Sequence, residues 1–133
     1  MQIIVAYLST GLVFLALDAL WLGFMASRVY RPLIGDLMAE QPNWPPAVLF
    51  YLLYIAGVVF FAVQPALASG RWTTALMLGA FLGLLAYGTY DLTNHATLRN
   101  WPLAMTAIDL AWGTFATAVA ATAGLLITRA FTA

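Results

Sequence analysis

The sequence contains no cysteine and no lysine, and only 8% of its 133 residues are charged. The missing cysteines exclude a disulfide framework. Five arginines balance five acidic residues, so the chain has no net charge and no basic surface that would attract nucleic acid. Since an average soluble domain has about 25% charged residues, so few charges exclude a soluble globular domain.

Hydrophobic residues make up 64% of the chain, which excludes a disordered protein and leaves an integral membrane protein. Each membrane span needs roughly 20 to 25 residues, so this length suits one four-helix unit. The hydrophobic runs predict spans at about residues 3–27, 47–68, 73–97 and 103–128. We therefore expect an all-α, polytopic four-helix bundle that forms a single integral membrane domain over residues 1–133.

The first hydrophobic run is predicted to be a retained transmembrane helix. A cleavable signal peptide would have arginine or lysine before its hydrophobic run, and none precedes this one. The run also contains Asp18. We expect Arg28 and Arg31 to end this helix. A short helix lying in the membrane interface is predicted just after them, because four apolar residues share one helical face: Leu33, Ile34, Leu37 and Met38.

The other three spans are joined by short connections, which predict an up-down-up-down order with both termini on one side of the membrane. Pro65 is expected to kink the end of the second span. In the third span, Gly79 and Gly83 form a small-xxx-small pattern that favours close helix contact. Arginines number three at one side of the bundle and two at the other, which does not decide its orientation.

Three carboxylates are predicted to lie within the membrane at one depth. Asp18 stands ten residues before Arg28, Asp91 eight before Arg99, and Asp109 eight after Trp101. At about 1.5 Å per residue, all three lie roughly 12 to 15 Å below the same interface. Ionisable residues inside a span are costly, so we interpret the three acids as a functional site that protons, a cation or arginines must neutralise.

The third span adds further polar candidates. Helical spacing places Tyr87, Asp91, Asn94 and His95 on one stripe, and we expect His95 to donate a hydrogen bond to Asp91 one turn away. With their polar or aromatic neighbours, the candidates for ligand or proton binding are Asp18, Asp91, Asn94, His95, Asp109, Tyr87, Tyr90, Trp21 and Trp112. Hydrogen bonding or packing between helices is the alternative role for Asn94, the tyrosines and the tryptophans.

A divalent metal is one cofactor that these residues could hold. Asp18, Asp91, His95 and Asp109 would offer an oxygen-rich site with one imidazole, a set that suits Mn, Fe, Mg or Zn. Neither haem nor a nucleotide is expected, because the single histidine cannot form a bis-His pair and phosphate-binding motifs are missing.

Two segments of the chain resemble each other. The first span contains Asp18-Ala19-Leu20-Trp21-Leu22-Gly23, and the fourth contains Asp109-Leu110-Ala111-Trp112-Gly113. Because these spans run in opposite directions, the similarity indicates either an inverted relation or chance in a tryptophan-rich chain.

These two segments, together with Tyr87-Gly88-Thr89-Tyr90-Asp91-Leu92-Thr93-Asn94 and Trp101-Pro102, resemble a family of small bacterial predicted membrane proteins of unknown function. The resemblance covers essentially the whole chain, and the segment from Thr89 to Asn94 is its most specific part. It implies a four-helix protein of the bacterial cytoplasmic (inner) membrane and supplies no reaction. The matching positions are Asp18, Trp21, Tyr90, Asp91, Asn94, Asp109 and Trp112.

Three functions follow from these features. The first is a buried Asp/His cluster that binds a proton, a cation or a polar ligand head, with small-molecule transport as one use. The second is a membrane-embedded, lipid-modifying enzyme or its accessory subunit, with the cluster as an acid/base or metal site. The third is a structural subunit of a larger membrane complex. Membrane lipids are expected partners, as is a second copy of the chain, because four helices are few for alternating access.

Overall fold

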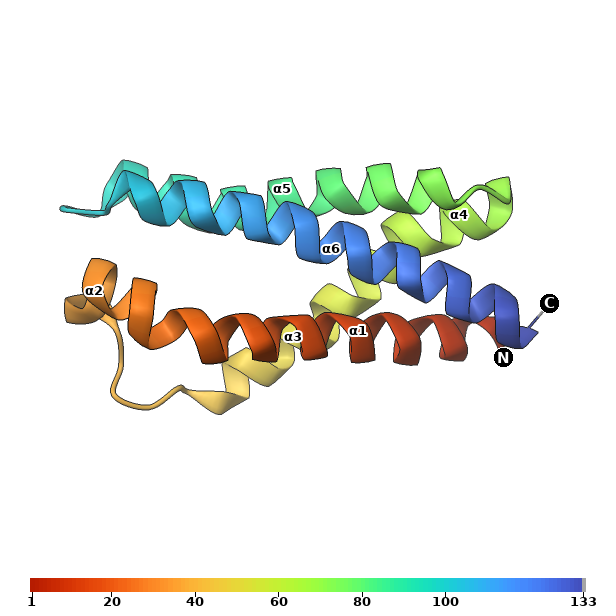
Figure 1. The fold of residues 1–133 in the computed structure, drawn as a ribbon, viewed down its shortest axis with the longest axis horizontal. Coiled ribbons are helices and arrows are strands. Elements are labelled where there is room, and N and C mark those ends of the chain that lie inside the picture. Colours follow the sequence, from red (N-terminus) through yellow and green to blue (C-terminus); the bar gives the residue numbers. More distant parts are fainter. Residues whose placement is uncertain (133) are drawn as a thin grey trace.

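The computed structural model describes residues 1–132, and all regular structure within that range is helical. Four helical segments are long and apolar enough to cross a membrane: Gln2–Leu37, Trp44–Ser69, Trp72–Thr97 and Leu103–Thr132. They run alternately in opposite directions, and both termini lie at the same end of the molecule (Figure 1). The predicted all-α membrane bundle is therefore confirmed.

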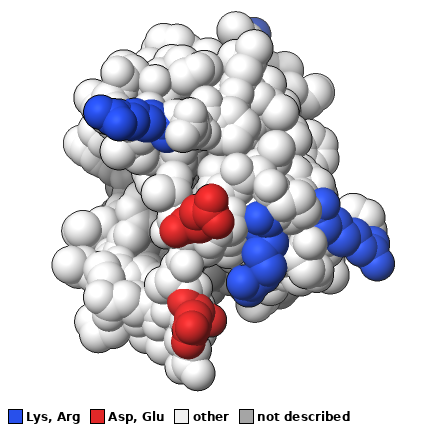
Figure 2. Space-filling model, turned by 90° about the vertical axis from the view of Figure 1, so that its left-hand side faces the viewer, with Lys and Arg blue, Asp and Glu red and all other residues white. Residues whose placement is uncertain are grey.

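The two ends of the bundle differ in the connections and termini that they carry. The loop end holds the connections at residues 38–43 and 98–102, and the terminal end holds both termini and the turn at residues 70–71. Figure 2 looks onto the loop end, where acidic side chains lie beside basic ones on an otherwise uncharged surface. The exposed charged residues near this end are Arg28, Arg31, Asp36, Glu40 and Arg99.

The first segment continues well beyond its predicted end. Helix α1 (Gln2–Met25) passes into a π-helical turn η1 (Ala26–Tyr30), then α2 (Arg31–Ile34) and a short 3₁₀ turn η2 (Gly35–Leu37). The expectation that Arg28 and Arg31 end the helix is wrong. Long arginine side chains reach out from a helix, and the Arg28 guanidinium lies 4.3 Å from the Phe24 ring centre. The predicted short helix is present as α2, but it continues the first segment.

The second segment is distorted ahead of its proline. It consists of α3 (Trp44–Val58), a π-helical turn η3 (Val59–Val63) and α4 (Gln64–Ser69). Pro65 has no N–H to donate within the helix, and the widened turn directly before it accommodates that loss. The segment crosses the bundle obliquely: α3 packs on α1, whereas η3 and α4 pack on α5 (Figure 1).

Helices α5 (Trp72–Thr97) and α6 (Leu103–Thr132) form the closest helix pair. Small residues allow this contact, as the glycine pattern of the third span predicts. A Cβ atom on Gly79 would lie 2.9 Å from the Cβ of Ala121, and one on Gly83 would overlap the carbonyl group of Gly113. No larger side chain fits at Gly83 unless the helices separate.

The hydrophobic core occupies the half of the bundle nearer the terminal end. Its largest side chains are Phe14, Val58, Val63 and Leu125, each no more than 1% exposed. Alanines of α6 fill the space around them, including Ala116, Ala120 and Ala121. We call this part the terminal half and the part beyond it, toward the connections, the loop half.

Candidate functional site

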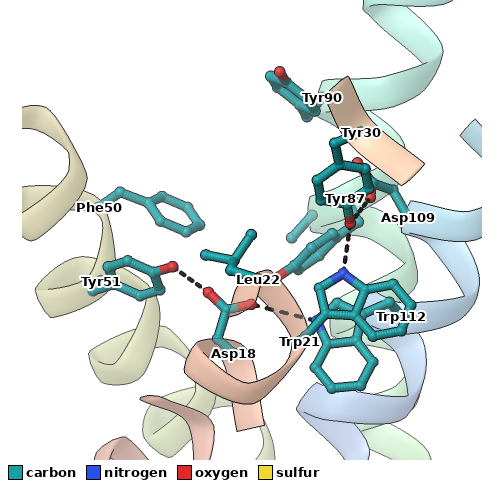
Figure 3. Close-up of a pocket in the computed structure, with 11 residues that line it drawn as sticks. Asp18, Trp21, Leu22, Tyr30, Phe50, Tyr51, Tyr87, Tyr90, Asp109 and Trp112 are labelled. Carbon is teal, nitrogen blue, oxygen red and sulfur yellow. Dashed lines mark hydrogen bonds between the residues drawn. The ribbon is translucent and has the colours of Figure 1, made fainter. Parts of the chain in front are cut away.

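A cavity of about 340 Å³ lies in the loop half, where α3 has diverged from α5. Its wall is formed by α1, η1, α3, α5 and α6 (Figure 3). Aromatic side chains make up most of this wall, and two aspartates supply its carboxylates. The residues that line the cavity are Asp18, Trp21, Leu22, Tyr30, Phe50, Tyr51, Ala86, Tyr87, Tyr90, Asp109 and Trp112.

Asp18 lies on α1 and is held by donors from two other helices. The Tyr51 hydroxyl on α3 donates to one carboxylate oxygen. The indole Nε1 of Trp112 on α6 donates to the other over a long 3.4 Å. Only 7% of Asp18 is exposed, so these bonds partly replace the water that a carboxylate normally binds.

Asp109 on α6 is held through a chain of two hydrogen bonds. The Tyr30 hydroxyl donates to its Oδ1 over 2.6 Å, and Trp21 Nε1 donates to the Tyr30 oxygen, also over 2.6 Å. Tyr30 reaches Asp109 because the first helical segment continues beyond Arg28 and carries this tyrosine into the bundle. Like Asp18, Asp109 therefore receives its hydrogen bond from a neutral group.

The two similar segments meet face to face. The rings of Trp21 and Trp112 stack in parallel, with centroids 4.2 Å apart and planes 7° apart. Trp112 donates to Asp18 of the opposite segment, while Trp21 reaches Asp109 through Tyr30. This exchange across antiparallel helices is the arrangement that an inverted relation between the segments would produce.

Asp91 lies outside the cavity wall, although the sequence groups it with the other two acids. It is fully buried on α5, and both of its oxygens lack a hydrogen-bond donor among the described residues. A buried carboxyl group without a donor is far less costly in its neutral form than in its charged form.

His95 does not make its predicted bond to Asp91. Its Nδ1 lies 3.3 Å from the Thr106 hydroxyl on α6, and that oxygen accepts a 3.0 Å bond from Trp101 Nε1. The predicted stripe is therefore divided: Tyr87 lines the cavity, Asp91 is buried outside its wall, and His95 joins α5 to α6. Asn94 is half-buried and lies outside the cavity wall, whereas Tyr90 contributes to the wall.

The four predicted metal ligands are not assembled into one site. Within residues 1–132, the structure contains no group of three His, Cys, Asp or Glu side chains placed to hold a metal ion. The reason is local: Asp18 is turned to Tyr51 and Trp112, and His95 is turned to Thr106. The cavity as built has two carboxylates surrounded by rings, which is a poor set of ligands for a divalent metal.

Sequence reasoning missed two tyrosines of the site. Tyr30 falls in the predicted connection between the first two spans, because Arg28 is expected to end the first helix. Tyr51 belongs to a span that contains no charged residue to draw attention to it. The depth comparison could have found Tyr51, since it stands seven residues after Trp44, a residue type that is common at membrane interfaces. At about 1.5 Å per residue, it lies near the level predicted for Asp18.

A family model described as a predicted membrane protein (DUF2177) matches residues 3–126. Since this match covers nearly the whole chain, the chain belongs to that family, whose function is unknown, and the resemblance predicted from the sequence is confirmed. No curated protein and no solved structure matches the chain.

Proposed function

We propose that this member of the DUF2177 family is a membrane-embedded binding protein. Its cavity takes the polar head of a small amphipathic molecule, and the apolar part of that molecule lies along the aromatic wall toward the lipid. The observation that carries the proposal is the pair of buried carboxylates, Asp18 and Asp109, in an otherwise aromatic and apolar cavity. Ligand sites in proteins combine these two features: an apolar wall and a few convergent polar groups.

The size of the cavity supports a small ligand. Its volume of about 340 Å³ lies at the lower end of the range for small-molecule sites. Several wall residues are partly exposed at the outer surface of the bundle, among them Leu22, Phe50 and Tyr90. A ligand with one polar end could therefore be held without entering the molecule completely.

Binding is favoured over passage through this single chain. Between the cavity and the terminal end lies the hydrophobic core, including Phe14, Val58 and Leu125. A transported molecule would have to separate these close-packed side chains. Transport through the chain alone would therefore require a large rearrangement, whereas binding from the loop half requires none.

We place the protein in the cytoplasmic membrane of a bacterium, as the family resemblance implies, with both termini on one side, as the alternating order of four spans implies. Partition between inner and outer membrane fractions tests this location. A terminal fluorescent or enzymatic reporter identifies which side the termini face.

The binding proposal is tested by filling the cavity. Purified protein in lipid nanodiscs is titrated with a panel of single-chain amphiphiles: decanol, decanoate, decylamine and decyltrimethylammonium. We expect at least one to bind saturably to the unmodified protein and to lose that binding in Ala86→Phe, which inserts a ring into the cavity. The control is Ala111→Phe on the exposed face of α6, which should bind as the unmodified protein does. Saturable binding that is equal in both variants, or absent throughout, contradicts the proposal.

A further inference from the structure

We infer that the ligand head is an organic ammonium group, a primary or methylated amine carried on an apolar body. This inference rests on the proposed binding function and names its ligand class. It follows from three properties of the cavity: the sign of its charge, the nature of its wall, and the donors already present there.

The charge of the cavity is negative or neutral and cannot be positive. Asp18 and Asp109 both line it, and no lysine, arginine or histidine is among its lining residues in the described chain. The groups that bond to the two acids are the neutral Tyr30, Tyr51 and Trp112. Neutral donors stabilise a carboxylate without cancelling its charge, so a bound cation would supply the missing opposite charge.

The rings around the carboxylates favour a particular kind of cation. Trp21 and Trp112 present a stacked pair, and Phe50, Tyr87 and Tyr90 complete the wall (Figure 3). The faces of aromatic rings attract cations, most strongly when the cation is poorly hydrated, and aromatic cages are a recurring means of binding quaternary ammonium groups. An ammonium carrying methyl groups also keeps favourable contact with apolar surface.

An inorganic cation fits this wall less well. A divalent metal requires several oxygen ligands close together, and the structure contains no such group of acidic or histidine side chains among residues 1–132. A metal ion that enters the cavity would lose bound water, and the aromatic side chains offer no ligand atoms in its place. The cavity is also far larger than a single ion, whereas about 340 Å³ accommodates an ammonium head with part of its chain.

The experiment compares decyltrimethylammonium with its uncharged isostere, in which carbon replaces the nitrogen, on the unmodified protein in nanodiscs of zwitterionic lipid. We expect the cation to bind about tenfold more tightly after subtraction of its partition into empty nanodiscs. Asp18→Asn and Asp109→Asn should each remove most of that preference while the isostere binds as before. Asp36→Asn is the control, because it removes an acidic charge at the exposed loop end.

The outcomes separate the two proposals. A preference that survives both cavity substitutions overturns the ammonium inference and leaves the binding function standing. Equal binding of the cation and the isostere, which has no polar head, also overturns it. The binding function then stands only if another amphiphile of the panel, such as decanol, binds saturably and loses that binding in Ala86→Phe. If no amphiphile binds saturably, both proposals are wrong. The cation and its isostere are compared on the unmodified protein, so this part of the result does not depend on whether a variant folds.

Discussion

Compared with the loop half of the bundle, the terminal half is filled with much smaller side chains. Glycines and alanines let α5 and α6 approach closely there, and Phe14 and Leu125 close the remaining space. In the loop half, large rings and the divergence of α3 leave a cavity. One four-helix framework therefore combines a close-packed middle with a cavity walled by large rings. A second hollow, of about 280 Å³, lies between α1 and α4 at the terminal end, beyond the packed side chains.

Threonines bond within their own helix in both halves, as Thr93 and Thr97 do in the loop half, whereas the buried acids of the loop half bond between segments. Thr122 and Thr128 in the terminal half donate to carbonyl groups of their own helix, four residues earlier. Asp18 and Asp109 in the loop half accept bonds from other helical segments. Bonds within a helix satisfy a hydroxyl locally, whereas bonds between segments fix side chains around a shared space. The position of the site follows from this difference.

The largest effect is expected from Gly83→Leu, which tests the close-packed part directly. Its side chain would enter the space of the Gly113 carbonyl group and force α5 away from α6. We expect the variant to lose about 3 kcal/mol or more of folding free energy and to fail to give folded, monodisperse protein. Size-exclusion chromatography and thermal unfolding in detergent measure the result.

The matched control for Gly83→Leu is Gly57→Leu, since nothing lies within 4 Å of a Cβ at Gly57. It should fold normally. Equal stability of the two variants would contradict the close contact between α5 and α6.

Truncation of a side chain should cost more stability in the terminal half than in the loop half. Phe14→Ala leaves a void in a fully packed core and should cost about 3 to 5 kcal/mol. Leu22→Ala only enlarges a cavity that is already present, at a residue that is 42% exposed, and should cost about 1 kcal/mol or less. Reversible unfolding in mixed micelles gives both values, and similar costs would argue against a hollow loop half.

Removal of single hydroxyl groups should have smaller, unequal effects. Tyr51 and Tyr7 both join α1 to α3, but Tyr51 donates to the Asp18 carboxylate and Tyr7 to the backbone carbonyl of Leu52. We expect Tyr51→Phe to cost about 2 kcal/mol and Tyr7→Phe about 1 kcal/mol or less, because bonds to charged acceptors are stronger. Only Tyr51→Phe should alter amphiphile binding, and the same titration detects this. The reverse order of costs would show that Asp18 does not depend on Tyr51.

The smallest effect is expected from Asp91→Asn. Both oxygens of Asp91 lack a donor among the described residues, so a neutral asparagine of nearly the same shape replaces the buried acid at little cost. The unfolding free energy at neutral pH should change by less than about 1 kcal/mol. A loss as large as that from Phe14→Ala would show that asparagine cannot replace the native carboxyl group at this position. Asp91→Leu provides the comparison: its larger, branched side chain does not fit the fully buried space of the aspartate, so this variant should be clearly less stable.

Much of the fold was predictable because membrane spans leave a strong hydropathy signal. The third segment begins at Trp72 and ends at Thr97, close to the predicted range, since turn residues flank it on both sides. The end of the first segment was not predictable from its charges. Arg28 and Arg31 are exposed on the helix surface, so an arginine there does not require the helix to end.

The site was predictable in part. Asp18 and Asp109 could be selected because a buried acid is rare and their depths can be counted along the helices. The roles of Tyr30 and His95 depend on how the helices rotate and pack, which a single sequence does not specify. His95 has Asp91 as a neighbour one turn away along α5, yet it bonds to Thr106 because α6 packs against that face.

The absence of cysteine from this chain permits one direct measurement of the cavity's preference for cations. Ala86→Cys places a single thiol in the wall, where cationic trimethylammonium-ethyl and anionic sulfonatoethyl methanethiosulfonates can react with it. Relative to a free thiol in solution, we predict that the cationic reagent is favoured by about tenfold and that Asp18→Asn reduces this preference. An unchanged or reversed ratio at this position would contradict an acidic, cation-binding cavity.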